Sequence, residues 1–437
     1  MAPWGEDFRK KQNVMIASND MPDIMVIDNN GAEIKYATSG TLLPLNQYFS
    51  QYPNIEKSRK QEVWDLMKFS DGNIYSIPTC SYYEDEPIQT SRMLLYREDW
   101  LMKFNQKVPE TLEQYYEVAD AVSNRDPDGD GKKDTYAISG NKDTIIRNTF
   151  DHIFGAFGIQ PNYWFVKDGK IVNGSIMPEA KEALKFINKM YKAGMIDPDF
   201  ITDDQKRQKD KFLKGMYSGS VFFSSVIDKD ANTDDYYRIF KNNNPQGGFV
   251  QGKLLSTSGY KSMGFGNLSR RGWMRTAVMA RSKVIDAALR VLDFSSSKEG
   301  SMLYNFGIKD TDYVERNGKV IPIASEDEKK KVGINMYHIP IIRTELWPNT
   351  TREYSQKLVD WTKNTVDNIS DELLVQETAE YENYLDSYTD EQFSKMIMGV
   401  IPIDTGFEQF VQEWKARGGE KVLNALNKAF SENKTKK

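Results

Sequence analysis

Short apolar runs alternate with amphipathic segments along most of this sequence, and this alternation restricts the fold more than any other feature. The run PDIMVID (22–28) begins with proline and is followed by NNG, which is typical of a short buried strand that closes in a turn. The segment 178–192 has apolar residues at helical spacing, proline at its first position and Gly194 just beyond its end. Strands that alternate with helices predict layered α/β structure.

Further segments carry the same two patterns. In PETLEQYYEVADAV, Thr111 stands at a helix N-cap position. A strand-like run from Thr276 leads into a helix whose apolar residues share one face: Ile285, Ala288, Leu289 and Leu292. We also expect one helix over about 354–382, and a last helix over about 407–430 that a Gly-Gly pair interrupts.

Length and composition narrow the class of protein. A chain of 437 residues is too long for one ordinary core, so we expect two domains or one large two-lobed architecture. The 58 basic and 63 acidic residues leave a formal charge of -5, which argues against a nucleic-acid partner. Cys80 is the single cysteine and excludes an intrachain disulfide. No run approaches about 18 consecutive apolar residues, the length that would indicate a membrane-spanning helix.

The stretch DPDGDGKKDTY (126–136) is the strongest candidate metal site. Calcium takes six to eight oxygen ligands, and a short loop can supply them from alternating positions. The predicted ligands are Asp126, Asp128, Asp130, the backbone carbonyl of Lys132, and Asp134. The bidentate glutamate usual at the twelfth position is replaced by Ala137, and no second loop is present to pair with this one. We therefore predict a structural calcium clip rather than a sensor; a solvated Asp-Gly turn is the alternative.

The order of several motifs resembles one protein family. LYREDW and VPETLEQYYEVADAV precede the acidic loop, and FGAFGIQPNYWFVKDGKIVNGSIMPEAKEALKFINKMYKAG follows it. DGNIYSIPT, YVERNGKV and the closing FEQFVQEWKARGGEKVLNAL also stand in family order. The sequence resembles bacterial extracellular solute-binding proteins of the family-1 type, especially the calcium-bearing lipoprotein branch that includes alginate-binding proteins.

This resemblance implies a two-lobed periplasmic-binding-protein fold of type II character, with a multi-segment hinge and a ligand cleft between the lobes. We expect residues 1–137 and 275–340 in the N-terminal lobe, and residues 138–274 and 341–437 in the C-terminal lobe. The acidic loop would then brace the N-terminal lobe. Such carriers deliver carbohydrates to the permease subunits of an ABC importer, so we expect a carbohydrate ligand, a permease partner and a monomer.

The resemblance also implies an extracellular or periplasmic location. Family members begin with a leader, a lipid-modified cysteine and a first strand. The first residues here, MAPWGEDFRKKQNVMIASND, match neither a signal peptide nor a lipid-attachment motif. We therefore expect the precursor to carry a lipid anchor ahead of this sequence.

Sugars present apolar faces and hydroxyl-lined edges, so a sugar site needs aromatic platforms and planar polar groups. The residues that the resemblance points to as ligand contacts are Asp28, Asn29, Tyr82, Tyr83, Trp164, Ser224, Trp273, Arg343 and Trp347. Several have a competing structural role: a turn at Asp28 and Asn29, core packing at Trp164 and at one of Tyr82 and Tyr83, and a surface or hinge contact at Trp273 and Trp347. Arg271 or Arg343 could pair with the carboxylate of an acidic sugar.

An enzyme is the competing class, in particular a polysaccharide hydrolase or lyase with structural calcium. His152 and His338 are the two histidines, and neither stands in HExxH. GxSxG, the Walker loop and GxGxxG are also absent from the sequence. A pair of catalytic carboxylates remains compatible with 63 acidic residues. A sugar-sensing surface protein is the third alternative. We predict a carrier that binds an oligosaccharide without turnover.

Overall fold

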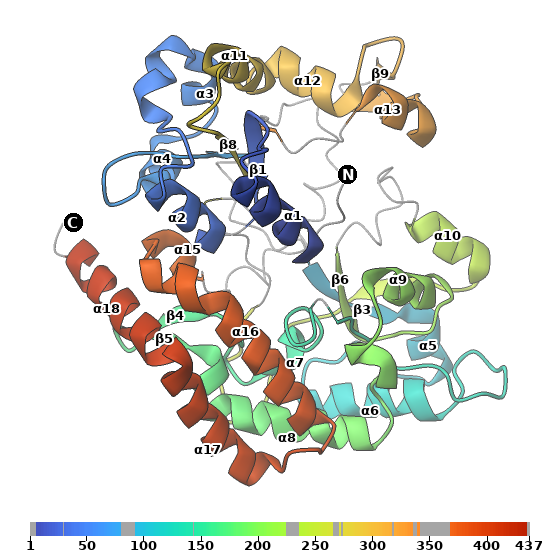
Figure 1. Cartoon of the computed structure of the whole chain (residues 1–437). Helices are drawn as coiled ribbons and strands as arrows, with labels where there is room; N and C mark the ends of the chain where they lie inside the picture. Colours follow the sequence, from blue (N-terminus) through green and yellow to red (C-terminus); the bar gives the residue numbers. More distant parts are fainter. Residues whose placement is uncertain are drawn as a thin grey trace. The chain divides into compact units, whose positions relative to one another are not determined.

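The computed structural model describes residues 6–28, 30–79, 92–142, 144–223, 236–264, 271, 274–316, 319–334, 339–340 and 368–434. The chain divides into two compact units (Figure 1). The first unit comprises Met1–Ile88, Ser269–Thr351 and Leu374–Glu380. The second comprises Gln89–Leu268, Arg352–Leu373 and Tyr381–Lys437. Each unit is therefore assembled from three separate stretches of sequence.

A three-stranded sheet lies in the first unit. Its strand order is β1 (Ile24–Ile27), β8 (Arg275–Val278) and β2 (Ile77–Pro78), and the central β8 is antiparallel to both neighbours. The two apolar runs predicted as strands are thus confirmed, and they pair with each other directly. The pairing joins segments about 250 residues apart, so this sheet forms only after the chain has passed through the second unit.

Helices surround this sheet. Their bounds are Glu6–Ala17 (α1), Asn30–Thr38 (α2), Pro53–Lys57 (α3), Gln61–Met67 (α4), Ile285–Ser295 (α11), Lys298–Phe306 (α12) and Glu326–Val332 (α13). A 3₁₀ turn covers Asn46–Gln51, and β9 (Tyr313–Arg316) pairs with β10 (Lys319–Pro322). The predicted stripe of α11 is confirmed, because Ala288, Leu289 and Leu292 are buried in one apolar cluster with Trp64.

The second unit also contains a three-stranded antiparallel sheet. Its central strand is β3 (Arg92–Arg97), between β6 (Ser220–Phe223) and β7 (Phe249–Gln251). A separate hairpin joins β4 (Trp164–Lys167) to β5 (Lys170–Asn173). Asp168 and Gly169 form its two-residue loop with φ of 51° and 78°, as a type I′ turn requires.

Helices of the second unit include the two expected from the sequence, one after the Thr111 cap and one over 178–192. They are Glu98–Lys103 (α5), Leu112–Asn124 (α6), Asp151–Ala156 (α7), Pro178–Lys192 (α8), Gln205–Leu213 (α9) and Tyr236–Asn243 (α10), with 3₁₀ turns at Gly174–Ile176 and Pro198–Ile201. The Thr111 side chain accepts a hydrogen bond from the backbone N–H of Gln114, which confirms the predicted cap of α6. The apolar stripe of α8 is buried at Ala180, Ala183, Leu184, Ile187 and Met190.

The C-terminal helices differ in part from the prediction. Residues 354–367 lie outside the described part, but the single helix expected over 354–382 is wrong beyond it. α15 (Ser370–Leu373) is followed by Leu374, whose φ of 45° breaks the helix before α16 (Gln376–Ile397) begins. The predicted interruption of the last helix is confirmed. α17 (Ile403–Trp414) and α18 (Glu420–Lys434) are joined by a π-helical segment, Lys415–Gly419, in which Gly418 has a φ of 116°.

The division into units differs from the expected lobe boundaries over residues 89–137 and 374–380. Residues 89–137 were expected in the N-terminal lobe and belong to the second unit, whereas residues 374–380 were expected in the C-terminal lobe and belong to the first. The physical reason is that β3 is the central strand of the second sheet. In addition, the Tyr115 hydroxyl of α6 donates a 2.7 Å hydrogen bond to the carbonyl of Gly219 beside β6.

The apolar face of α11 gives a direct test of the first unit's core. Leu292 is fully buried, whereas the adjacent Val291 is 51% exposed. We expect Leu292→Ala to lower the free energy of unfolding by about 2–5 kcal/mol, because it removes buried contacts and leaves a cavity. Val291→Ala is the matched control and should change it by less than about 0.5 kcal/mol. Urea denaturation followed by circular dichroism measures both, and equal effects would contradict the assigned packing.

Candidate metal site and ligand-binding residues

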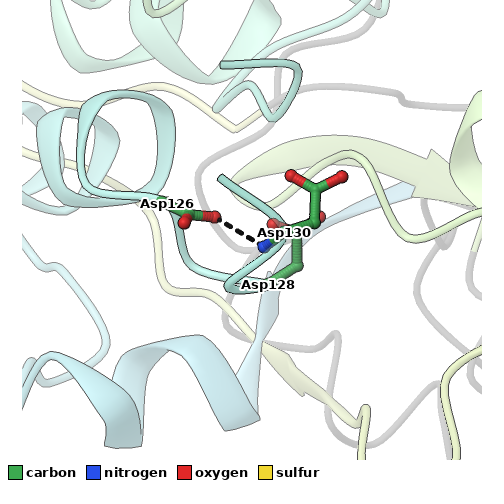
Figure 2. Close-up of side chains that lie close together, drawn as sticks. All are labelled: Asp126, Asp128 and Asp130. Atoms are coloured by element: carbon green, nitrogen blue, oxygen red, sulfur yellow. Dashed lines mark hydrogen bonds between the residues drawn. The ribbon is translucent and has the colours of Figure 1, made fainter. Parts of the chain in front are cut away.

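The acidic loop predicted to bind calcium follows directly after α6 and gathers three carboxylates. One oxygen each of Asp126, Asp128 and Asp130 lies within 4.8 Å of the others, and Figure 2 shows the three side chains on this loop. Lys132 is exposed and forms an ion pair with Asp130, with 2.6 Å between Nζ and Oδ2. Asp134, the fourth predicted carboxylate, is outside this group of three.

Backbone geometry explains how such a short loop brings these groups together. Asp126, Gly129 and Gly131 have φ of 49°, 78° and 80°, so the chain reverses twice within six residues. The carboxylate of Asp126 accepts hydrogen bonds from the backbone N–H groups of Gly129, Asp130 and Gly131, at 2.9, 3.2 and 3.1 Å (Figure 2 shows the bond from Asp130). The loop therefore winds around Asp126.

The electrostatics of the loop fit a hard cation. Desolvation, a hydrogen bond with Asp126 and the charge of Asp130 raise the pKa of Asp128. Desolvation acts in the same direction on Asp126, but hydrogen bonds from backbone N–H groups outweigh it and lower the pKa of that carboxyl. The Oδ1 atom of Asp134 is buried and accepts no hydrogen bond in the described part of the chain. An all-oxygen donor set with crowded negative charge suits calcium or a similar ion.

The loop is anchored within the second unit. The Lys103 ammonium of α5 donates hydrogen bonds to the carbonyls of Asp126 and Pro127, at 3.0 and 2.8 Å. Just beyond the loop, the N–H of Tyr136 donates to the carbonyl of Met216. These contacts differ from the expectation that the loop braces the N-terminal lobe, because every partner belongs to the second unit.

Most of the predicted sugar contacts fall on residues that the structure does not describe. Asn29, Tyr82, Tyr83, Ser224, Trp273, Arg343 and Trp347 lie outside the described residues. Asp28 is described, and it lies half-buried directly after β1. The pKa of Tyr36 is raised first by burial and then by the charge of Asp28.

Trp164 is buried in the second unit. Its exposed fraction is 1%, and its ring centroid lies 5.7 Å from that of Trp414. Its indole Nε1 donates a 3.1 Å hydrogen bond to Oε1 of Glu382. A ring enclosed in this way has little free face for stacking on a sugar, so the structure favours the packing role that the sequence left as the alternative.

A buried charge cluster next to Asp28 was not predicted. Glu33 of α2 is fully buried, and its Oε2 lies 2.9 Å from both Nη2 of Arg271 and Nε of Arg275. Arg271 also donates a 2.8 Å hydrogen bond to Asn30. Desolvation would raise the pKa of Glu33, but the two guanidinium charges together with hydrogen bonds lower it. Arg271 is therefore engaged with Glu33 rather than exposed to an acidic sugar.

A second mixed cluster lies in the second unit. Glu382, Asp386 and Asp390 are spaced four residues apart along α16, a pattern that the sequence displays and that sequence reasoning overlooked. The Arg147 guanidinium carbon lies 4.7 Å from the ring centroid of Tyr163, and the charge of Arg147 lowers the pKa of both Asp386 and Asp390. Burial and then the charge of Glu382 raise the pKa of Asp386. Burial raises the pKa of Asp390 to about 7.

Asp390 makes stability depend on pH. Arg147 and a 3.3 Å hydrogen bond from Asn162 lower its pKa and the charge of Asp151 raises it, but desolvation dominates. Between about pH 4, where an unfolded aspartate titrates, and about pH 7, the folded state holds a proton that the unfolded state releases. The free energy of unfolding should therefore fall as the pH rises through this window.

We expect Asp390→Asn to lose this part of the pH dependence, because asparagine does not titrate. Urea denaturation at several pH values between about 4 and 8 measures it. Glu391→Gln, at the neighbouring exposed position, is the matched control and should keep the pH dependence of the parent protein. An unchanged profile in Asp390→Asn would contradict the raised pKa.

Comparison with known proteins places the chain in a family. Residues 4–302 match the bacterial extracellular solute-binding protein family. The chain is 26% identical over 458 residues to lipoprotein LipO of Bacillus subtilis strain 168, covering 99% of this chain and 86% of LipO. No helix in the described residues is long and apolar enough to cross a bilayer.

Solved structures share the fold. FusA, an ABC-transporter substrate-binding protein of Streptococcus pneumoniae solved with kestose, matches with a TM-score of 0.78 at 20% identity, over 99% of this chain and 92% of FusA. The alginate-binding protein AlgQ2, solved without calcium ion, matches with a TM-score of 0.75 at 22% identity, over 97% and 89%. The predicted α/β solute-binding fold is confirmed, and the chain belongs to the bacterial extracellular solute-binding protein family.

Proposed function

We propose that this protein captures an oligosaccharide and delivers it to the permease of an ABC importer. The observation that carries the proposal is the likeness over 99% of the chain to FusA, a substrate-binding protein whose structure contains kestose. The resemblance of the ordered sequence motifs supports the same class. Solute-binding proteins of this kind close around a ligand by a hinge motion and present it to the membrane partner.

The aromatic and polar residues named from the sequence are the proposed sugar contacts. Trp273 and Trp347 stand in polar segments, SRRGWMRT and RTELWPNT, where an indole ring has no evident core to fill. Asp28 and Asn29 follow β1, and their planar polar groups suit the hydroxyl edge of a sugar. Tyr82, Tyr83, Ser224 and Arg343 complete the proposed set, from which Trp164 is withdrawn because of its burial.

Calcium at the acidic loop is the proposed cofactor. Asp126, Asp128, Asp130, the carbonyl of Lys132 and Asp134 would hold it, and the ion would neutralise the crowded carboxylates. Its role is structural, because the loop is fixed by Lys103 and by backbone pairing within one unit. We further propose that the protein acts as a monomer outside the cell membrane, held by a lipid anchor as the lipoprotein relative suggests.

The sugar proposal predicts binding without turnover. Isothermal titration against neutral and acidic oligosaccharides should give saturable binding, and chromatography after prolonged incubation should return the sugar intact. We expect Trp347→Ala to weaken binding by about 1–3 kcal/mol if the ring stacks on the sugar. Trp64→Phe, in the buried core of the first unit, is the control for indole replacement and should leave affinity unchanged. Release of new reducing ends would instead identify a polysaccharide-degrading enzyme.

The metal proposal predicts that chelation lowers the melting temperature of the parent protein. With free calcium about 100-fold above its Kd, an ion that binds only the folded state contributes about 2.7 kcal/mol. Asp128→Asn should abolish this response to chelator. Sugar affinity at one fixed temperature should barely change with calcium, since the role is structural. A steep dependence of sugar affinity on calcium would show that the loop is a switch.

A further inference from the structure

A hollow of about 550 Å³ lies on the surface of the second unit, and none of the residues proposed above as sugar contacts is among the described residues that line it. Its position is between the first turns of α16 and the π-helical segment that joins α17 to α18, the orange and red helices of Figure 1. The side chains that matter for its chemistry are Tyr381, Tyr384, Lys415, Arg417 and Lys421. Its volume is in the range of small-ligand sites.

The backbone is shaped to hold one of these rings. Gly418 has a φ of 116°, and a Cβ built on it would lie 2.2 Å from Cδ1 of Tyr381. Any larger residue would therefore push the Tyr381 ring away from the π-helical segment. Gly418 is a non-helical residue at a kink between two helices.

The cations hold the tyrosine rings at defined positions. The Lys421 ammonium donates a 3.1 Å hydrogen bond to the Tyr381 hydroxyl and lies 5.3 Å from the centroid of its ring. The Arg417 guanidinium hydrogen-bonds the Tyr384 hydroxyl and lies 4.4 Å from the ring centroid of Tyr388. Because both hydroxyls accept from a cation, each keeps its own proton to donate to a ligand.

The charge and exposure of the lining select a class of ligand. Three lining residues are basic (Lys415, Arg417 and Lys421), and one, Glu420, is acidic. Tyr384 is 48% exposed, so part of its ring is available for an apolar sugar face. Ammonium and guanidinium groups beside an aromatic ring suit a sugar that carries a carboxylate.

We infer that this hollow is a second carbohydrate site, which binds an acidic oligosaccharide through uronate carboxylates. Lys415 and Lys421 hold the carboxylate, and the ring of Tyr384 contacts the apolar face of an adjacent sugar. The hollow lies on the outside of one unit, so it can hold part of a longer chain. The inference does not rest on which sugar the predicted contact residues bind, or on delivery to a permease.

Trigalacturonate and its methyl ester are the probes, because they share the sugar chain and differ in charge. Hydrogen–deuterium exchange of the full chain should show protection of residues 381–388 and 415–424 by trigalacturonate and none by the ester. Lys415→Ala combined with Lys421→Ala should remove this protection and weaken binding at this site at least about tenfold, the effect of losing two charge-assisted contacts. Tyr384→Ala should weaken it by a smaller factor.

Lys428→Ala is the matched control, because Lys428 is an exposed lysine of α18 outside the hollow and its loss should change nothing. Raising the salt concentration should weaken binding at the hollow, since its cations are exposed. Equal protection by the methyl ester, or protection that survives the double lysine variant, would overturn the inference. Failure of the sugar-carrier proposal would look different: neutral oligosaccharides would not bind, while protection of the hollow by trigalacturonate would persist.

Discussion

Each unit depends on one central strand whose partners come from distant parts of the sequence. In the first unit β8 is bonded on one side to β1 and on the other to β2, with Thr276 opposite both Val26 and Ile77. In the second unit β3 is bonded to β6 and β7. Closing such long loops costs conformational entropy, which the buried apolar faces on the sheets and helices must offset. Because each unit is built from separate stretches of the chain, neither unit can form from one contiguous segment.

Buried charge is distributed differently in the two units. Glu33 lies beside two arginines, whose charges lower its pKa although burial alone would raise it. The three side chains therefore form a fixed ion-pair cluster beyond the end of β1. Along α16, by contrast, burial outweighs the charge of Arg147, so both Asp386 and Asp390 have raised pKa values. The first cluster is a structural lock for α2. The second stores a proton near neutral pH, as groups at functional sites often do.

Positive backbone φ angles shape both the acidic loop and the C-terminal hollow. Positive φ at Asp126, Gly129 and Gly131 turns the loop so that three carboxylates converge. Positive φ at Gly418 lets the ring of Tyr381 rest against the π-helical segment. In both places hydrogen bonds from a lysine help to offset the strain of the unusual backbone. Lys103 donates to the loop, and Lys421 donates to the Tyr381 hydroxyl.

The sequence alone determined the elements whose signal is local. The strand 24–27, the capped helix 112–124, the stripe of α8, the Gly-Gly interruption and the converging aspartates all follow from neighbouring residues, because turns, caps and helix periodicity act over a few positions. Tertiary structure alone decided which distant groups meet. Arg271 finds Glu33 across 238 residues, Trp164 finds Trp414, and residues 89–137 join the second unit through β3. Such partners leave no periodic trace, since long-range contacts are set by packing and by competition for buried charge.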